Sequence, residues 1–285
     1  MSYLKPDCIV DNMIKTGAYK SQLGFKDIFI RGSLCGAFLA YATSFAYMAE
    51  IQTKPIIGAL LFPVGVALII LFGMELLTGN FALLPSAFLD KKCSAARVFR
   101  NWALVFVSNF FGSVLYGVMF TIVLKGHFNN PALVQKFINV AEGKTIAYAH
   151  MGSYGLLVAF VSAVLCNWMV TLGTIIPYCS STTSGKIMAL WLPIMTFFAL
   201  GYEHTVVNMF VIPTGIMLGA NVTLSDWWLW NQIPVTLGNL LGGAVFTATA
   251  FYLTYVVKGE TKQFPIQKPA LLVKGLEGDV ASGQD

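Results

Sequence analysis

The sequence predicts an all-α membrane protein with six transmembrane helices, arranged as two inverted three-helix repeats whose second and fifth helices are broken. Composition is the first reason, since 56% of the 285 residues are hydrophobic, 11% are charged, and the mean hydropathy is +0.71. Apolar runs long enough to span a bilayer are the second reason. The third is an internal repeat, in which the frame Gly73-x-Glu75-x-x-x-x-Asn80 returns as Gly201-x-Glu203-x-x-x-x-Asn208.

The basic charge balance does not indicate a nucleic-acid partner. The formal net charge is +5, but the cations lie between apolar runs instead of forming one stripe, which is typical of the cytoplasmic flanks of membrane helices. The five cysteines show no CxxC or metal-type spacing, and the sequence has no Walker-type phosphate loop, HExxH motif or nucleophile elbow. We therefore expect neither an enzyme nor a bound cofactor or metal.

The first half of the chain is predicted to hold a surface helix and three spans. Residues 1–27 are polar with apolar residues at helical spacing, and they predict a cytosolic amphipathic segment. This helix would lie either on the membrane surface or against the inner ends of the bundle. The first repeat is expected at residues 28–124, with spans at 28–49, 55–89 and 101–124.

The second of these runs is too long for one straight span. Residues 55–89 would extend ~52 Å as a single helix, whereas the hydrocarbon core of a bilayer is ~30 Å thick. A break inside the membrane resolves this mismatch, and Gly73, Gly79 and Pro85 are the residues suited to form it.

The second half is predicted to follow the same order. An extracytoplasmic connection is expected at 125–152 and the second repeat at 153–257, where the apolar run 187–219 again requires a break. Residues 258–285 are expected to form a cytosolic tail. With both termini inside, 14 Lys and Arg residues face the cytosol and 4 face outward, so the positive-inside rule favours a multi-pass plasma-membrane protein with both ends cytoplasmic.

An ionisable pair lies in the middle of the fifth run. Three spans per half make the repeats inverted, so the two breaks meet near the midplane, where such folds hold their substrate. We expect His204 to act there, by hydrogen-bonding an anion or passing it a proton, because ionisable groups inside a membrane are costly without a use. Glu203 has the wrong sign for an anion path. Like Glu75, it is expected to brace broken backbone, bonded to Asn167 or to backbone amides.

Four further polar residues lie in apolar segments, where each needs a partner. Thr78 follows the first break, where its hydroxyl could replace water around a passing anion or simply cap a helix. Asn167, Asn208 and Asn239 could brace the break loops or touch the substrate. Bracing is the safer interpretation, and Asn208 is expected to lie nearest the site.

Several separate signatures resemble those of the formate–nitrite transporter family, in the family's order. They are GMELLTG at 73–79, CNWMV at 166–170, GYEH at 201–204, NMFVIP at 208–213 and IPVTLGN at 233–239. The resemblance covers roughly residues 10–258. It implies an aquaporin-like six-span subunit in the lipid bilayer, assembled as a homopentamer, with a path for an anion through each subunit. The run at 79–85 is most similar to the formate and nitrite branches, so one of these small anions is the expected substrate.

The resemblance also implies roles for individual residues. His204 resembles the family's central histidine, and Thr78 the loop threonine of the first break. Phe62, Leu76 and Phe197 resemble the outer constriction, and Val66, Leu77 and Val170 the inner one. Asn167, Asn208 and Asn239 match the polar supports, and Lys144 matches a vestibule lysine only if an insertion precedes Asn167. Met74 replaces a usually small residue and Leu77 a commoner Phe, which leaves the choice of substrate open.

Other functions are compatible with the same sequence. A hydrosulfide or lactate transporter of the same family, or a neutral-solute or water channel, would share the architecture, although the pair Glu203–His204 argues against a neutral solute. An intramembrane enzyme is disfavoured because no nucleophile or metal set accompanies His204. A sensor or scaffold with an inactive pore is the remaining alternative.

Overall fold

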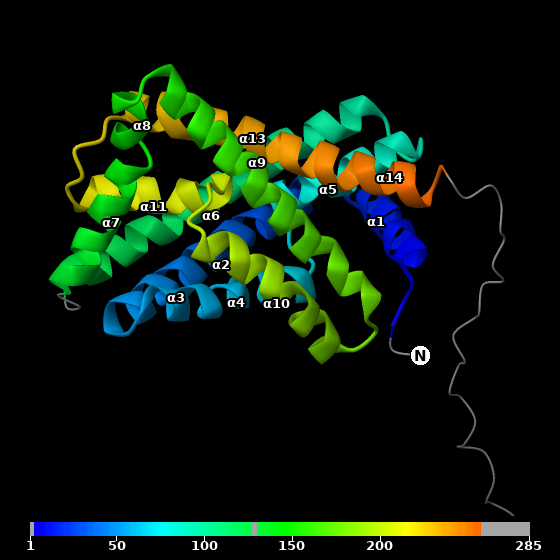
Figure 1. Ribbon diagram of the computed structural model, residues 1–285, viewed down its shortest axis with the longest axis horizontal. Coiled ribbons are helices and arrows are strands. Elements are labelled where there is room, and N and C mark those ends of the chain that lie inside the picture. Colours follow the sequence, from blue (N-terminus) through cyan, green and yellow to red (C-terminus); the bar gives the residue numbers. More distant parts are fainter. Residues whose placement is uncertain (1–2, 127–129, 258–285) are drawn as a thin grey trace, which may run out of the picture.

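A computed structural model describes residues 3–126 and 130–257, and within these ranges the chain is almost entirely helical (Figure 1). The described residues contain no β-strand, and their only β contact is an isolated bridge between Tyr3 and Ser180. The predicted all-α class is confirmed for this part of the chain. The tail predicted at 258–285 lies outside it.

Four helical rods in the described ranges are long and apolar enough to cross a membrane. They are α2 (Phe25–Gln52), α6 (Ala95–Gly126), α9 (Ser153–Ile175) continued by η1 (Ile176–Cys179), and the run Leu224–Tyr255. The last comprises α12 (Leu224–Trp227), η2 (Trp228–Gln232), α13 (Ile233–Gly243), η3 (Ala244–Thr249) and α14 (Ala250–Tyr255). Asn231 and Gln232, consecutive residues of the π-helical turn η2, are both fully buried.

The two overlong apolar runs are interrupted. The first comprises α3 (Pro55–Leu61), α4 (Pro63–Leu71) and α5 (Leu77–Leu89), and the second α10 (Thr183–Ala199) and α11 (Thr205–Leu218). Gly73 (φ +64°) and Gly201 (φ +67°) lie in these interruptions, in the left-handed region that other L-residues rarely adopt. Gly79 and Pro85 were also predicted as break residues, but they lie inside α5, where Gly79 allows close approach to Thr174 of α9.

The N-terminal helix α1 (Pro6–Ser21) packs on the helix bundle. Val10, Met13 and Ile14 are buried on the face that contacts α5. Gly17 makes the closest approach, because a Cβ at this position would overlap the carbonyl of Leu83. Of the two positions considered from the sequence, packing against the bundle is the one observed.

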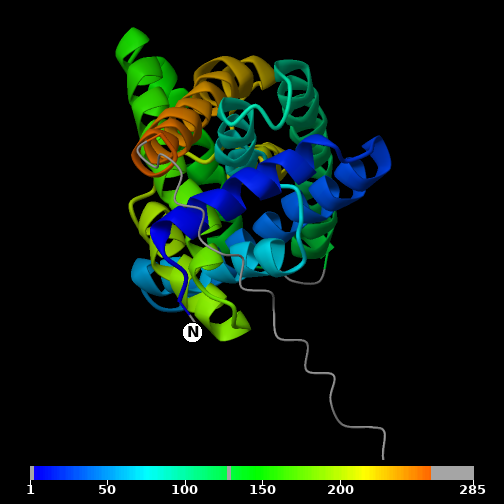
Figure 2. The ribbon, with the colours of Figure 1, turned by 90° about the vertical axis from the view of Figure 1, so that its right-hand side faces the viewer.

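The two halves of the molecule make matching helix contacts. α2 packs along α6 as α9 packs along α13, and α1 packs on α5 as α7 (Pro131–Gly143) packs on α11. The short helix α8 (Ile146–His150) lies between α7 and α9 in the chain. Figures 1 and 2 show α1 crossing one end of the bundle, and Figure 1 shows α7 at the other, so a capping helix lies at each end. The largest buried apolar cluster draws on α2, α4, α5, α9, α10 and α11, where the interrupted helices meet.

Candidate functional site

One buried asparagine on a neighbouring long helix fixes each interruption. Asn109 of α6 accepts a hydrogen bond from the N–H of Leu77 (3.0 Å) and donates to the carbonyl of Glu75 (2.8 Å). Asn239 of α13 makes the matching pair of bonds at the second interruption, 2.8 and 2.9 Å long. A side-chain amide both donates and accepts, so one asparagine can satisfy backbone groups on the two sides of a break.

A network of four polar side chains lies behind the first interruption. Asn80 Nδ2 donates to Glu75 Oε2 (2.8 Å) and to Asn101 Oδ1 of α6 (2.9 Å). Lys20 of α1 forms an ion pair with Glu75 Oε1 (2.5 Å) and donates to the Met74 carbonyl (3.1 Å). Asn101 in turn donates to the Lys20 carbonyl (3.1 Å), which ties α1 to α6 as well as to the break.

The second interruption has the same network. Asn208 Nδ2 donates to Glu203 Oε2 (2.7 Å) and to Asn231 Oδ1 of η2 (2.8 Å). Lys144 pairs with Glu203 Oε1 (2.9 Å), Tyr148 donates to the same oxygen (2.9 Å), and Asn231 donates to the Lys144 carbonyl (2.9 Å). Both ion pairs are largely removed from solvent, with lysine side chains 11% and 16% exposed. Each break therefore lies beside a buried, neutralised pair of charges instead of a free one.

Thr78 and His204 join the two interruptions. Thr78 Oγ1, in the first turn of α5, lies 3.0 Å from Nε2 of His204, the N-cap of α11, and both side chains are buried. His204 Nδ1 accepts a hydrogen bond from the N–H of Val207 (3.2 Å). Because this nitrogen is the acceptor, a neutral ring carries its proton on Nε2 and donates it to the Thr78 hydroxyl. The hydroxyl proton of Thr78 is then available to bind an anion.

Asn167 of α9 lies beside this contact. Its Nδ2 donates to the carbonyls of Thr78 (3.1 Å) and Asn239 (2.6 Å), so it links the first interruption to the second half of the chain. Its Oδ1 is buried and has no hydrogen-bond partner among the described residues. The prediction that Glu203 bonds to Asn167 or to backbone amides is wrong. Asn208, in the first turn of α11, donates to the Glu203 carboxylate instead.

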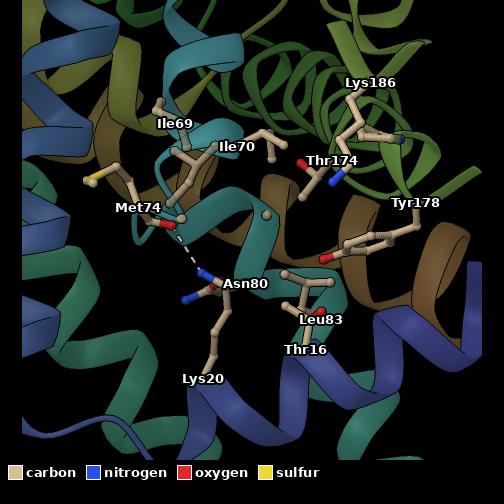
Figure 3. Close-up of a pocket in the computed structure, with 14 residues that line it drawn as sticks. Thr16, Lys20, Ile69, Ile70, Met74, Asn80, Leu83, Thr174, Tyr178 and Lys186 are labelled. Atoms are coloured by element: carbon tan, nitrogen blue, oxygen red, sulfur yellow. Dashed lines mark hydrogen bonds between the residues drawn. The ribbon is translucent and has the colours of Figure 1, made fainter. Parts of the chain in front are cut away.

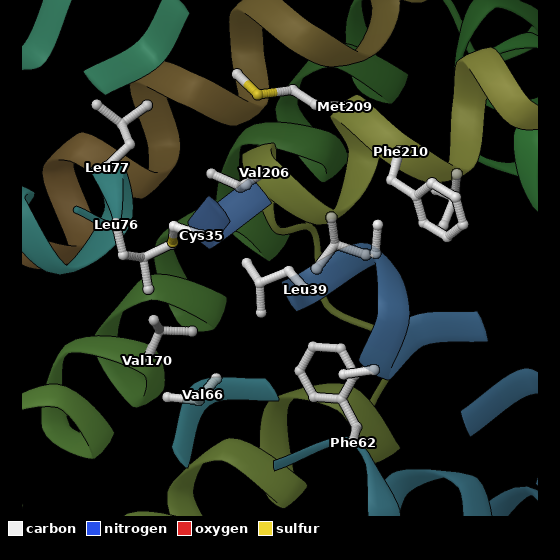
Figure 4. Packing of buried hydrophobic residues seen from close by; sticks show 14 of the residues in the cluster. Cys35, Leu39, Phe62, Val66, Leu76, Leu77, Val170, Val206, Met209 and Phe210 are labelled. Atoms are coloured by element: carbon white, nitrogen blue, oxygen red, sulfur yellow. The ribbon is translucent and has the colours of Figure 1, made fainter. Parts of the chain in front are cut away.

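Apolar side chains surround the Thr78–His204 contact. The six residues predicted to form constrictions all belong to one buried cluster: Phe62, Val66, Leu76, Leu77, Val170 and Phe197. The Phe197 ring stacks on His204 at a centroid distance of 5.5 Å and meets Phe62 edge to face at 5.6 Å. Figure 4 shows Leu76, Val66 and Val170 gathered on one side of this cluster.

Two cavities reach the two interruptions. One of about 220 Å³ is lined by residues that include Lys20, Gly73, Leu76 and Lys186 (Figure 3). The other, of about 180 Å³, is lined by residues that include Lys144, Phe197, Gly201 and His204. Each cavity thus contains the glycine of one interruption and the lysine of one network. Leu76 and Phe197, which the resemblance places in one constriction, line different cavities.

Sequence reasoning missed six site residues, which are Lys20, Asn80, Asn101, Asn109, Tyr148 and Asn231. Asn80 is part of the repeat frame, and Asn101 and Asn231 each lie eight residues before the asparagines that fix the interruptions, Asn109 and Asn239. That spacing would have identified both asparagines. The described residues contain no group of three or more His, Cys, Asp or Glu side chains placed to hold a metal ion.

The sequence model of the formate/nitrite transporter family matches residues 7–253, which is most of the chain. The chain belongs to this family. Its family is one of transporters, and four of its described helices are long and apolar enough to span a bilayer. The chain is therefore a membrane protein and not an enzyme.

Individual members of the formate/nitrite transporter family resemble this chain over almost its full length. A probable formate transporter of Methanothermobacter thermautotrophicus is 36% identical over 257 residues, which cover 83% of this chain and 91% of that protein. An uncharacterized transporter of Bacillus subtilis, YrhG, is 33% identical over 272 residues, with coverages of 92% and 98%. A solved pentameric formate channel with formate bound has a TM-score of 0.66 at 26% identity, covering 85% of this chain and 98% of that one.

Proposed function

We propose that this chain is a transmembrane channel for small monovalent weak-acid anions, with formate or nitrite as its substrate. The observation that carries the proposal is the Thr78–His204 hydrogen bond, which joins two helix interruptions inside an apolar cluster, with a cavity at each interruption. Membership in the formate/nitrite transporter family supports the choice of substrate, as does the name of the relative from M. thermautotrophicus.

The proposed topology is six crossings of the plasma membrane in two inverted repeats, with both termini in the cytosol. The crossings are α2, α3 to α5, and α6, followed by α9 with η1, α10 with α11, and Leu224–Tyr255. The twin networks of Lys20 and Lys144 support the inverted repeat, and the excess of cations on one side supports the orientation. Likeness to a solved pentameric formate channel supports a homopentamer.

The proposed mechanism is passage of the neutral acid. An anion enters the cavity beside Lys144 and meets the apolar cluster of Phe62 and Phe197, where a bare charge loses its hydration without replacement. Protonation removes that penalty, and the neutral acid crosses to the cavity beside Lys20. The Thr78 hydroxyl supplies a hydrogen bond midway along this path.

His204 serves this mechanism as the proposed proton relay. A relay through the ring requires Nδ1 to take up a proton. That step breaks the hydrogen bond that Nδ1 accepts from the Val207 N–H. The ring would then give its Nε2 proton to the Thr78 oxygen while the Thr78 hydroxyl passes its own proton to the anion. This leaves a neutral ring protonated on Nδ1, so that proton must be released and one regained on Nε2 before the next cycle. In this proposal Val66, Leu77 and Val170 form the inner constriction together with Leu76, which lines the cavity on the Lys20 side.

Uptake into proteoliposomes tests the substrate. Labelled formate, nitrite, hydrosulfide, lactate and acetate compete for entry into vesicles that contain the purified chain. We expect formate or nitrite to compete best. A preference for hydrosulfide or lactate would identify another branch of the family, and swelling with neutral solutes but no anion uptake would identify a neutral-solute channel.

The variant His204→Asn tests the relay. Asparagine is also a good N-cap, so the start of α11 is retained while the titratable ring is lost. We expect formate uptake to fall by about tenfold or more and to lose its dependence on pH. His150→Asn is the matched control, because His150 is exposed in α8 and lines neither cavity. Unchanged rate and pH dependence in His204→Asn would exclude the relay.

A further inference from the structure

A third, open cavity lies at the loop that joins α5 to α6, apart from the two cavities at the breaks. Its volume is about 690 Å³. It is lined by Phe88, Leu89, Lys91, Lys92, Cys93, Ser94 and Arg97. Its lining combines apolar side chains, among which Phe88 is 47% exposed, with three cations. The combination of exposed apolar surface and clustered positive charge at a helix end needs an explanation.

Lys91 has an unusual backbone conformation. Among the described residues it is the only non-glycine with a positive φ, 57°. It closes α5 in a turn in which the Lys92 N–H bonds to the Ala87 carbonyl (2.8 Å) and the Lys91 N–H to the Phe88 carbonyl (2.9 Å). Glycine is the usual residue at this position of such a turn, because any Cβ is strained there.

The other half of the chain contains the same turn built with glycine. Gly219 (φ 114°) closes α11, and the Ala220 N–H bonds to the Gly215 carbonyl (2.9 Å). Gly219 follows Lys91 by 128 residues, which is the offset between Glu75 and Glu203. The lysine is therefore unnecessary for ending the helix. Its positive charge is the property that distinguishes it from its counterpart.

The charges of the loop are not cancelled by nearby acids. Lys92 lies 3.9 Å from Asp90, and Asp90 also accepts a hydrogen bond from Tyr252 (3.4 Å). Lys91 and Arg97 form no ion pair with any residue in 3–126 or 130–257. The cavity thus holds two cations that have no anionic partner within the described chain.

We propose that this cavity binds the phosphate headgroup of an anionic phospholipid. Lys91 and Arg97 contact the phosphate from two sides, and an acyl chain lies along Phe88. Phe99, 65% exposed near the start of α6, extends this apolar surface. Charge complementarity and the position between the ends of two apolar helices favour a lipid over a protein partner. The corresponding turn contains Gly219 and Ala220 in place of the two lysines, and Lys125 of α6 reaches the end of α11 there by donating to the Met217 carbonyl (2.8 Å).

Cys93 provides a reporter, because this partly exposed cysteine is one of the residues that line the cavity. Burial raises the pKa of the Cys93 thiol, so alkylation by N-ethylmaleimide is followed at mildly alkaline pH. The full chain is placed in bilayer discs of phosphatidylcholine with or without phosphatidylglycerol, and peptide masses report the rate at each cysteine. We expect phosphatidylglycerol to slow alkylation of Cys93 severalfold. Cys8, exposed on α1, is the internal control and should change little.

The variants separate a lipid site from a structural lysine. Lys91→Gly should raise the melting temperature of the detergent-solubilised chain by relieving strain, and should abolish protection of Cys93. Arg97→Gln should weaken protection without raising the melting temperature. Lys54→Gln, a cation at the start of α3, is the control and should keep full protection. The proposal would be overturned by equal alkylation rates of Cys93 in the two lipids. It would also be overturned if the double variant Lys91→Gly with Arg97→Gln kept its protection, or if millimolar inorganic phosphate protected Cys93 as well as the lipid does.

Discussion

The side chain of Thr78 bonds to Nε2 of His204, and within residues 3–126 and 130–257 no other side chain bonds to this nitrogen. Thr78→Val keeps the shape but leaves the Nε2–H of His204 buried without an acceptor, at a cost of about 1–3 kcal/mol. We expect formate uptake to fall by about tenfold, which corresponds to the loss of one hydrogen bond of about 1.4 kcal/mol. Thr78→Ser keeps the hydroxyl and should keep most of the activity. Transport by Thr78→Val at the wild-type rate would remove Thr78 from the path.

Asn239 has a different task, since it holds backbone groups on the two sides of the second interruption. Asn239→Leu would leave the Thr205 N–H and the Glu203 carbonyl buried and unpaired. We expect the chain to lose more than ~2 kcal/mol of stability, measured as the shift of its thermal transition in detergent. Asn139→Leu, on the exposed side of α7, should shift it little. Equal shifts for the two variants would show that Asn239 does not support the break.

Single site residues were predictable from sequence when an ionisable side chain lay within an apolar run. His204, Glu203 and Glu75 were identified because ionisable groups in apolar runs require partners. Lys20 was not identified, because it lies in a polar segment where a lysine needs no explanation. Only the fold shows that α1 brings it against Glu75.

At the scale of helices, length was the informative quantity. The run 55–89 exceeds the bilayer thickness, and this predicted an interruption that the structure places at 72–76. The choice among Gly73, Gly79 and Pro85 needs backbone geometry, because only Gly73 has a positive φ and Pro85 is accommodated within α5. The position of α1 was left open because an amphipathic helix suits a membrane surface and a protein surface equally.

The ion pair between Lys20 and Glu75 is expected to hold α1 on the bundle. Lys20→Met leaves a buried carboxylate without its cation, at a cost of about 3–5 kcal/mol. Hydrogen exchange should accelerate in α1 and in the first turn of α5. The double variant Lys20→Met with Glu75→Gln removes both charges and should recover part of the loss.

Lys15→Met is the matched control on the same helix. Lys15 pairs with Asp11 at the surface, where both side chains are well exposed, so its loss should change stability by less than ~1 kcal/mol. If Lys20→Met and Lys15→Met gave the same exchange rates in α1, the buried pair would not be what docks this helix.

At the scale of the whole molecule, the two matching networks give the chain two similar ends, each with a cavity at an interruption. Lys20 and Lys144 each lie in a cavity at one interruption, and each is neutralised by a glutamate of the repeat frame. The halves differ at the centre, where Thr78 of the first half meets His204 of the second. The repeated frame supports the two interruptions, whereas Thr78 and His204, which have no counterpart in the repeat, are the residues that the proposed mechanism brings to the substrate.

This arrangement predicts which force drives transport. No uncompensated charge of the described residues lies at the apolar cluster between the cavities, so a bare anion has nothing to replace its water there. If the neutral acid crosses, labelled formate should accumulate in proteoliposomes with an alkaline interior and should not respond to a membrane potential set by potassium and valinomycin at equal pH. Formate accumulation by His204→Asn should respond neither to the pH gradient nor to the membrane potential. Accumulation driven by potential alone would show that the anion crosses in charged form, and protonation within the path would then be excluded.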